Sequence, residues 1–253
     1  MSLVDYNLSD EEEEESHNSD EYHGSSAKKR CLNSLVSTIG KQTKSDKDDV
    51  ENTGRVRTFP YERGNWATFI YVPVPFTDSM REIQSQIASS CEKDLDVQLH
   101  LIESIHISLT RTVVLQHHWI DDFKKSIREC VVDFKRFAIS IDTLSVYCND
   151  DCTTTFVALA VPDVYSTPLK ALVEKFDRCL NEYKLPCFYE DASFHVSILW
   201  CGGNKKAQIQ TEIDKLQQML NEAIEDDCDD YQFVVNRIEC KIGNKIYDYP
   251  LLS

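Results

Sequence analysis

Two short apolar runs constrain this chain more than any other feature of the sequence. Residues 105–115 read IHISLTRTVVL, and residues 194–203 read FHVSILWCGG. Runs of this length that are rich in β-branched and aromatic residues predict β-strands. Because side chains alternate between the two faces of a strand, each run would bury an apolar face and display polar side chains on the other face.

The polar face of each predicted strand carries a histidine and a hydroxyl. The first strand places His106, Ser108 and Thr110 on one face, and the second places His195 and Ser197 on one face. Two ordinary half-buried strands with incidental histidines are the alternative interpretation. The same His-apolar-Ser pattern occurs twice in a chain with only seven histidines, which favours a shared functional site.

These residue types suit the cleavage of a phosphodiester. Histidine titrates near neutral pH, so one imidazole can remove a proton while another supplies one. One histidine would take the proton from a ribose 2′-hydroxyl, whose oxygen attacks the adjacent phosphorus, and the other would protonate the leaving 5′-oxygen. The hydroxyls of Ser108 and Ser197, with help from Thr110, would donate hydrogen bonds to the non-bridging phosphate oxygens.

The rest of the sequence predicts one globular domain after a polar tail. Residues 1–52 contain few aromatic residues and many acidic, serine and lysine residues, which predicts a disordered acidic tail. Residues 53–253 predict a single domain in which strands and helices alternate. The expected elements are strand 66–74, helix 78–93, strand 105–115, helix 118–134, a hairpin over 137–161, helix 166–180, strand 194–203, helix 205–224 and strand 231–243. This order indicates an α+β fold with mostly antiparallel sheet, and the two His-x-Ser strands fall in comparable halves of it.

Charge and composition narrow the class of protein. The net charge of −16 argues against a long basic groove that follows an RNA backbone, but it leaves room for a local pocket that takes an RNA end. No run of about 18 apolar residues predicts a membrane span. Cys148 and Cys152 have no second pair to complete a zinc site, so we expect no metal and no cofactor. The AKKR cluster at 27–30 matches a short nuclear import signal, and a plain basic patch is the alternative.

Four segments of the sequence resemble the U6 small nuclear RNA (snRNA) phosphodiesterase family, which belongs to the two-histidine (2H) phosphoesterase superfamily. The segments are RTFPYERGNWATFIYVPV (57–74), HISLTRTVVLQHHWI (106–120), YEDASFHVSILWC (189–201) and CKIGNKIYDYPL (240–251). The resemblance covers about residues 55–253. It implies two pseudo-symmetric lobes around a central cleft, each a mostly antiparallel sheet with helices on its outer face.

The resemblance also implies an activity and a role for each residue of the motifs. Such an enzyme trims 3′-terminal uridines from U6 snRNA without metal and leaves a 2′,3′-cyclic phosphate or a 3′-phosphate. His106 and His195 would be the catalytic pair, Ser108 and Ser197 would hold the phosphate, and Tyr189 would stack on the terminal base. Which histidine is the base and which is the acid stays open.

The expected partner is therefore an RNA 3′ end, namely the oligouridine tail of U6 snRNA. The expected location is the nucleus, and the expected state is a monomer. Two alternatives remain: another cyclic phosphodiesterase reaction of the 2H type, or a non-catalytic module that binds RNA 3′ ends.

Overall fold

The computed structural model describes residues 64–253. The predicted acidic tail, residues 1–52, lies outside the described residues, so the tail and the domain boundary at residue 53 stay predictions. Within the described part, strands and helices follow one another in nearly the predicted order. No helix of residues 64–253 is long and apolar enough to cross a membrane.

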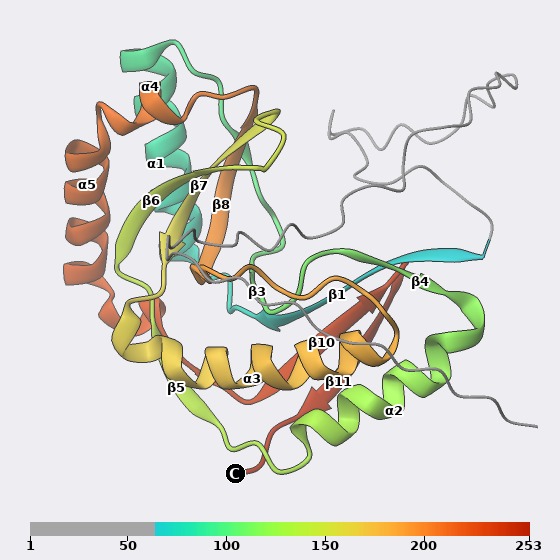
Figure 1. Cartoon of the computed structure of the whole chain (residues 1–253). Coiled ribbons are helices and arrows are strands. Elements are labelled where there is room, and N and C mark those ends of the chain that lie inside the picture. The colour runs from blue at the N-terminus through green and yellow to red at the C-terminus, as the bar shows by residue number, and fades with distance from the viewer. Residues whose placement is uncertain (1–63) are drawn as a thin grey trace, which may run out of the picture. The chain divides into compact units, whose positions relative to one another are not determined.

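One lobe is built on strands from both ends of the described chain. Its strands are β1 (Asn65–Pro73), β3 (His106–Ser108), β4 (Val113–Gln116), β10 (Arg237–Ile242) and β11 (Lys245–Pro250). Helices α2 (Ile120–Val131) and α3 (Asp163–Glu182) pack together beside this lobe, and α2 contacts β11 (Figure 1). A separate two-stranded sheet of β5 (Phe137–Ser140) and β9 (Gln232–Val235) adjoins α3.

The other lobe is built on the middle of the chain. Its strands are β2 (His100–Leu101), β6 (Thr143–Cys148), β7 (Thr154–Ala160) and β8 (His195–Gly202). Three helices cover its outer face, namely α1 (Asp78–Leu95), α4 (Lys206–Gln210) and α5 (Ile213–Asp226) (Figure 1). The short 3-10 helices η1 (His117–Trp119) and η2 (Cys228–Tyr231) complete the described elements.

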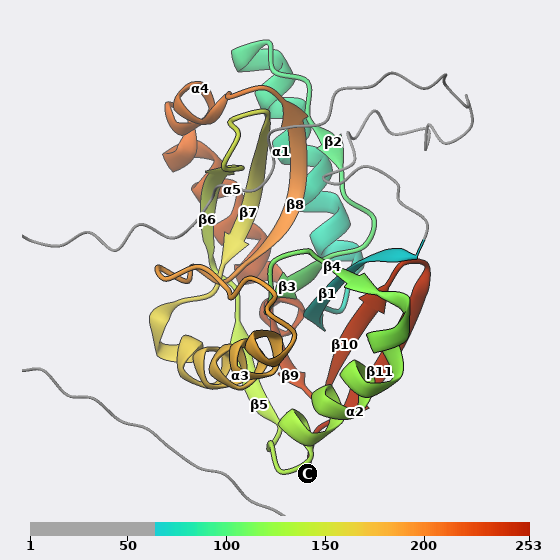
Figure 2. The same ribbon diagram turned by 45° about the vertical axis from the view of Figure 1, so that its right-hand side comes forward.

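The two lobes share one sheet, because β3 pairs with β1 on one side and with β8 on the other (Figure 2). The strand order is β11-β10-β1-β3-β8-β7-β6, with β4 beside β1 and β2 beside β8. All these pairs are antiparallel. The predicted bilobal α+β fold is confirmed, and the structure adds that the strands of both lobes form a single sheet.

Two helices tie the lobes together. Helix α1 follows β1 of one lobe but packs on α5 and β8 of the other, and α3 follows β7 but packs on α2. Each lobe therefore completes its core with a helix that enters from the other lobe. Such an exchange makes it difficult for either lobe to bury its apolar face alone.

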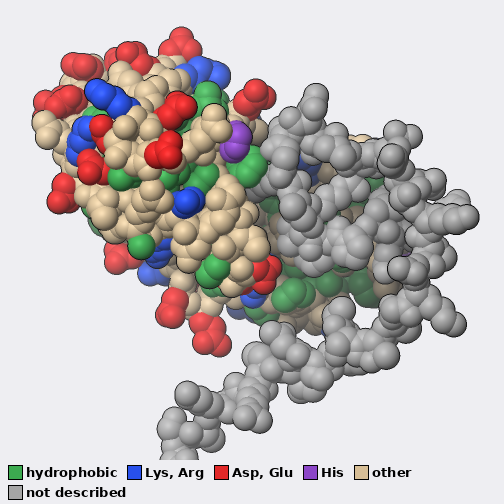
Figure 3. Space-filling view, turned by 90° about the horizontal axis from the view of Figure 1, so that it is seen from above, with side chains coloured by type: hydrophobic (Ala, Val, Ile, Leu, Met, Phe, Trp, Pro, Cys, Tyr) green, Lys and Arg blue, Asp and Glu red, His purple; other side chains and the backbone are tan. Residues whose placement is uncertain are grey.

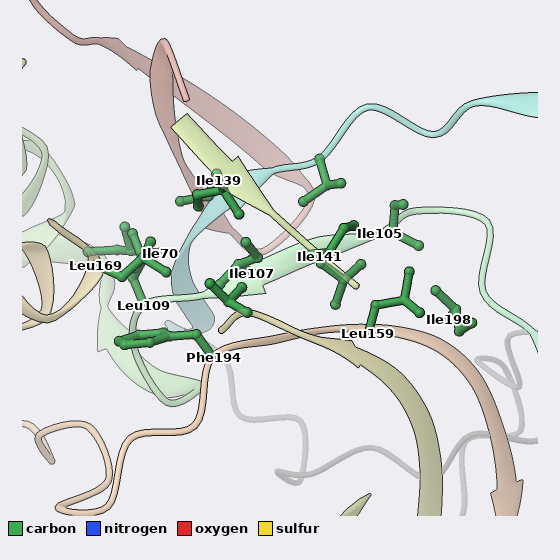
Figure 4. Close-up of a cluster of buried hydrophobic side chains, with 14 of the residues drawn as sticks. Ile70, Ile105, Ile107, Leu109, Ile139, Ile141, Leu159, Leu169, Phe194 and Ile198 are labelled. Carbon is green, nitrogen blue, oxygen red and sulfur yellow. The ribbon is translucent and has the colours of Figure 1, made fainter. Parts of the chain in front are cut away.

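The predicted alternation of buried and half-buried side chains is confirmed in both strands at the His-x-Ser motifs. Ile105, Ile107, Phe194 and Ile198 are buried in one apolar cluster (Figure 4). The histidines and serines of both motifs are half-buried. Burial of one face fixes the register of these strands, because a slip of one residue would turn the apolar side chains outward.

The predicted strand over residues 105–115 is broken in the middle, between β3 and β4. Both β3 and β4 pair with β1, and Thr110 lies in the bend between them. The Ile70 amide donates a hydrogen bond of 2.9 Å to Thr110 Oγ1, and the Leu109 amide donates one of 2.9 Å to the Ile70 carbonyl. Thr110 is buried at 3% exposure and its hydroxyl already accepts this bond, so its expected help in holding a phosphate stays a prediction.

We predict that Thr110→Val destabilises the fold by about 1–3 kcal/mol, because it leaves the buried Ile70 amide without an acceptor. Urea unfolding measures the loss, and amide hydrogen exchange at Ile70 localises it. Thr110→Ser keeps the hydroxyl and should keep the amide protected. A valine variant with unchanged stability and unchanged exchange at Ile70 would contradict this role.

Candidate active site

The register between β3 and β8 brings the two His-x-Ser motifs together. Ile107 lies opposite Val196 in this antiparallel pair. Continuing the register by one residue on each side places His106 opposite Ser197 and Ser108 opposite His195. Residues directly opposite each other have Cβ atoms about 4.5–5.5 Å apart on the same face of the sheet, and diagonal neighbours lie about 7–8 Å apart. The two histidines therefore occupy one diagonal of a small rectangle, and the two serines occupy the other.

His195 is held by its own loop and by a stacked tyrosine. Its Nδ1 lies 2.8 Å from the Ser193 carbonyl oxygen, and its ring stacks on Tyr147 with centroids 4.0 Å apart. The Tyr147 hydroxyl in turn lies 2.9 Å from Ser193 Oγ. Because a carbonyl oxygen only accepts, Nδ1 carries a proton, and Nε2 is the ring nitrogen left for chemistry. Burial lowers the pKa of His195 from its ordinary value, so its neutral form is favoured near pH 7.

His106 lies among aromatic rings of the neighbouring strand. Its ring centroid is 5.0 Å from that of Tyr71 and 5.5 Å from that of Phe69. The Tyr71 hydroxyl donates a hydrogen bond of 2.7 Å to Glu239 Oε2 on β10. Burial, with help from this carboxylate, raises the pKa of Tyr71, which keeps its hydroxyl protonated. Each histidine of the pair thus has a tyrosine from another strand beside it.

Tyr189 extends from the loop between α3 and β8 and is 47% exposed. The Arg111 guanidinium lies over its ring, 4.3 Å from the centroid, and Phe188 packs edge-on at 5.3 Å. Arg111 Nη2 also contacts Asp150 Oδ2 at 2.8 Å. This ion pair connects the bend after β3 with the turn between β6 and β7, and it supports the exposed ring from one side.

Sequence reasoning singled out His106, Ser108, His195 and Ser197, and the structure brings all four to one face of one sheet. Their catalytic and phosphate-binding roles, and the stacking role of Tyr189, stay predictions. Among residues 64–253, no group of three or more His, Cys, Asp or Glu side chains is placed to hold a metal ion.

Sequence reasoning missed Tyr71, Tyr147, Arg111 and Asp150. One signal for Tyr71 was present, since Phe69 and Tyr71 alternate with the buried Ile70 in a β-rich run. Tyr147 and Asp150 come from a segment distant in sequence from both motifs. Arg111 follows the first motif closely, but it meets Tyr189 only through the fold.

Comparison with known proteins agrees with this geometry. A family model described as "HVSL: Uncharacterised conserved protein" matches residues 27–250. The U6 snRNA phosphodiesterase 1 of Drosophila melanogaster is 37% identical over 205 residues, which cover 81% of this chain and 77% of the relative. The Mus musculus protein of the same name is 36% identical over 205 residues, which cover 81% of this chain and 76% of the relative.

A solved structure shows the same fold. The structure of Kluyveromyces marxianus Usb1 superimposes with a TM-score of 0.53 at 16% sequence identity, over 76% of this chain and 100% of that chain. The antiparallel bilobal fold and the paired His-x-Ser strands define the class as a 2H phosphoesterase. Within that class, the chain belongs to the HVSL family, whose relatives here carry the name U6 snRNA phosphodiesterase 1.

We predict that Tyr147→Ala raises the pKa of His195 toward its ordinary value, because it removes the ring that shields the imidazole from water. An NMR titration of the His195 ring, assigned with a His195→Gln variant, measures the change. Tyr147→Phe keeps the stacked ring and should leave the pKa close to that of the wild type. An unchanged pKa in the alanine variant would show that Tyr147 does not desolvate His195.

Proposed function

We propose that this chain is a phosphodiesterase that removes nucleotides from the 3′ end of RNA, one at a time, by attack of a ribose 2′-hydroxyl. The observation that carries the proposal is the register that places His106 opposite Ser197 and Ser108 opposite His195. A phosphate centred over this rectangle would have an imidazole at two diagonally opposite corners and a hydroxyl at the other two.

The reaction uses the two imidazoles as a base and an acid. One histidine takes the proton of the penultimate ribose 2′-hydroxyl, and that oxygen forms a bond to the adjacent phosphorus. The bond from phosphorus to the 5′-oxygen of the terminal nucleoside breaks, and the other histidine protonates this oxygen. The products are an RNA with a 2′,3′-cyclic phosphate and a released nucleoside.

The serines and Tyr189 hold the substrate during these steps. Ser108 and Ser197 donate hydrogen bonds to the non-bridging oxygens, where negative charge accumulates. Tyr189 stacks on the base of the terminal nucleotide, which fixes the end of the chain against the two histidines. These groups position the substrate and stabilise the negative charge that develops on the phosphate oxygens, so the proposed reaction needs no cofactor.

U6 snRNA is the proposed substrate, with trimming directed at its 3′-terminal uridines. Support comes from the names of the curated relatives and from a Kluyveromyces marxianus Usb1 structure with uridine monophosphate, which shares the fold with a TM-score of 0.52. A nuclear location follows from this substrate. A monomer suffices for the reaction, because one chain contributes both motifs.

The test is a gel assay of a 5′-labelled RNA that ends in uridines, in the presence of EDTA. We expect stepwise shortening by the wild type. Loss of one imidazole should lower the rate about 10²–10⁴-fold, so His106→Ala and His195→Ala should both leave the RNA nearly intact. His117→Ala is a matched control, because this exposed histidine lies outside the site.

A second RNA separates cleavage from binding. Its penultimate ribose carries hydrogen in place of the 2′-hydroxyl, so the proposed nucleophile is missing and the enzyme should bind it without shortening it. A wild-type protein that shifts both RNAs on a native gel and cuts neither would establish the binding module instead. Opening of a small cyclic phosphodiester with no shortening of RNA would establish the other 2H reaction.

Arg111 should affect substrate binding more than the chemical step. We predict that Arg111→Ala raises KM and leaves kcat nearly unchanged, because the guanidinium contacts the Tyr189 ring and not a histidine. A cation–π contact at an exposed site is worth about 0.5–1 kcal/mol, which is about a two- to fivefold change in KM. Steady-state kinetics measure the effect.

A double variant tests whether the arginine acts through the tyrosine. In a Tyr189→Ala background, Arg111→Ala should add little to the rise in KM. An equal rise in both backgrounds would mean that Arg111 contacts the RNA directly, for example at a phosphate.

A further inference from the structure

Four aromatic side chains lie in register across one lobe of the sheet. Tyr147 on β6 lies opposite Phe156 on β7, Phe156 lies opposite Trp200 on β8, and Trp200 lies opposite His100 on β2. Residues in register on adjacent strands share a face. The four residues form an aromatic row that begins with the tyrosine stacked on His195 and ends at an edge strand.

A bulge in β8 places this row on the face of the active site. Trp200 is three residues beyond Ser197, so in a regular strand the two would point to opposite faces. Ser197 lies opposite Ala158 and Leu199 lies opposite Val157, which leaves Ile198 as an extra residue. The extra residue returns Trp200 to the face of Ser197. Bulges beside active sites commonly redirect a side chain in this way.

The bulge is held by buried hydrogen bonds. Gln84 on α1 is 3% exposed, and its Nε2 donates to the carbonyl oxygens of Ile198 at 2.6 Å and Ile102 at 3.0 Å. The Ile102 amide also donates to the Ile198 carbonyl at 3.0 Å. The Ile198 carbonyl therefore has two donors, and the position of Trp200 is fixed by the fold.

The outer end of the row is open to solvent. The rings of His100 and Trp200 lie side by side, with centroids 4.6 Å apart and planes tilted by 33°. Trp200 is half-buried, whereas His100 is exposed on a two-residue edge strand that pairs with β8. Buried aromatic pairs across strands are explained by sheet stability alone. A tryptophan directed to the active-site face and continued by an exposed ring suits a ligand that stacks.

We propose that Trp200 and His100 form a subsite that stacks on a nucleobase upstream of the scissile phosphodiester. This subsite rests on the proposed function for the identity of the ligand and the direction of the strand. Tyr189 precedes β8 and Trp200 lies toward its other end, with His195 and Ser197 between them. If the terminal base lies at Tyr189, the RNA that leaves the phosphate on the opposite side meets Trp200.

The chemistry of the surface favours a nucleobase. Aromatic side chains displayed on an antiparallel sheet are a common way to stack single-stranded bases, and stacking tolerates different bases because each has a π-face. The subsite would therefore add affinity for RNA longer than the terminal nucleotides, with little preference for sequence.

The test measures the binding of an uncleavable RNA, with hydrogen in place of the penultimate 2′-hydroxyl, by fluorescence anisotropy. His100→Ala should raise Kd about tenfold, the change expected for the loss of one stacked base. Leu101→Ala is the matched control, because Leu101 is exposed on the same short strand but points to the other face. Equal affinities of His100→Ala and the wild type would overturn the proposal.

Two further variants separate stacking from charge. His100→Phe keeps a ring and should bind like the wild type, whereas His100→Lys keeps only a cation and should bind like the alanine variant. The opposite result would overturn stacking in favour of a phosphate contact. Abasic substitutions at the second, third and fourth nucleotides from the 3′ end locate the base, because one of them should abolish the difference between the wild type and His100→Ala. A persistent difference with all three would also overturn the proposal.

Failure of the subsite and failure of the proposed function give different results. If the wild type shortens a normal RNA but His100→Ala binds as well as the wild type, only the subsite is wrong. If the wild type binds RNA with the predicted dependence on His100 and cleaves nothing, the stacking surface is real and the proposed activity is wrong.

Discussion

The antiparallel contact between β3 and β8 is the constraint on which the site depends. Only a register with Ile107 opposite Val196 places each histidine across from the serine of the other strand. A slip of one residue would turn the histidine and the serine of the slipped strand into the core, and a slip of two would lose both His–Ser pairs, because it would set histidine opposite histidine or serine opposite serine. The register is held from both sides, because β1 pairs with β3 and β7 pairs with β8 along most of its length. The joining of two lobes into one sheet is therefore what assembles the site.

The pseudo-symmetry of the site is incomplete, and the differences suit two distinct roles. Each histidine lies beside a tyrosine, but Tyr71 donates its hydroxyl to a carboxylate while Tyr147 bonds to Ser193. His195 is stacked face to face at an interplanar angle of 17°, whereas the ring of His106 is tilted by 56° to that of Tyr71. Burial lowers the pKa of His195, and distinct surroundings suit the acid and the base of the proposed reaction.

How much of this could be read from the sequence depends on the range of each interaction. The alternation that exposes His195 and Ser197 is local, so the pattern of apolar residues predicts it. The break after β3 was not predictable, because the Thr110 hydroxyl replaces a strand hydrogen bond to Ile70, which is distant in sequence. The bulge at Ile198 was not predictable for the same reason, because it is held by Gln84, which is distant in sequence. Regular alternation alone would assign Trp200 to the buried face. Arg111 reaches Tyr189 only through the packing of three loops. The alternation of apolar residues and the residue types of the motifs indicated the chemistry. The side chains that position the two histidines and Tyr189 depend on contacts between residues distant in sequence.

The acidity of the chain is compatible with an RNA substrate if recognition is local. Acidic side chains gather at the end that carries α1, α4 and α5, with lysines and arginines interspersed (Figure 3). Fields of exposed charges are largely screened beyond about 10 Å at ordinary salt. Cations at the site therefore affect a phosphate there more than the net charge of the whole chain does. Lys241 lies opposite Phe69, on the face that contains His106, and Arg111 lies over Tyr189. A net negative chain gains little from long tracts of phosphate. In the proposed reaction, affinity for RNA would come from stacked bases and a few hydrogen bonds, which favours an RNA end held on the face of β3 and β8 over the body of a duplex.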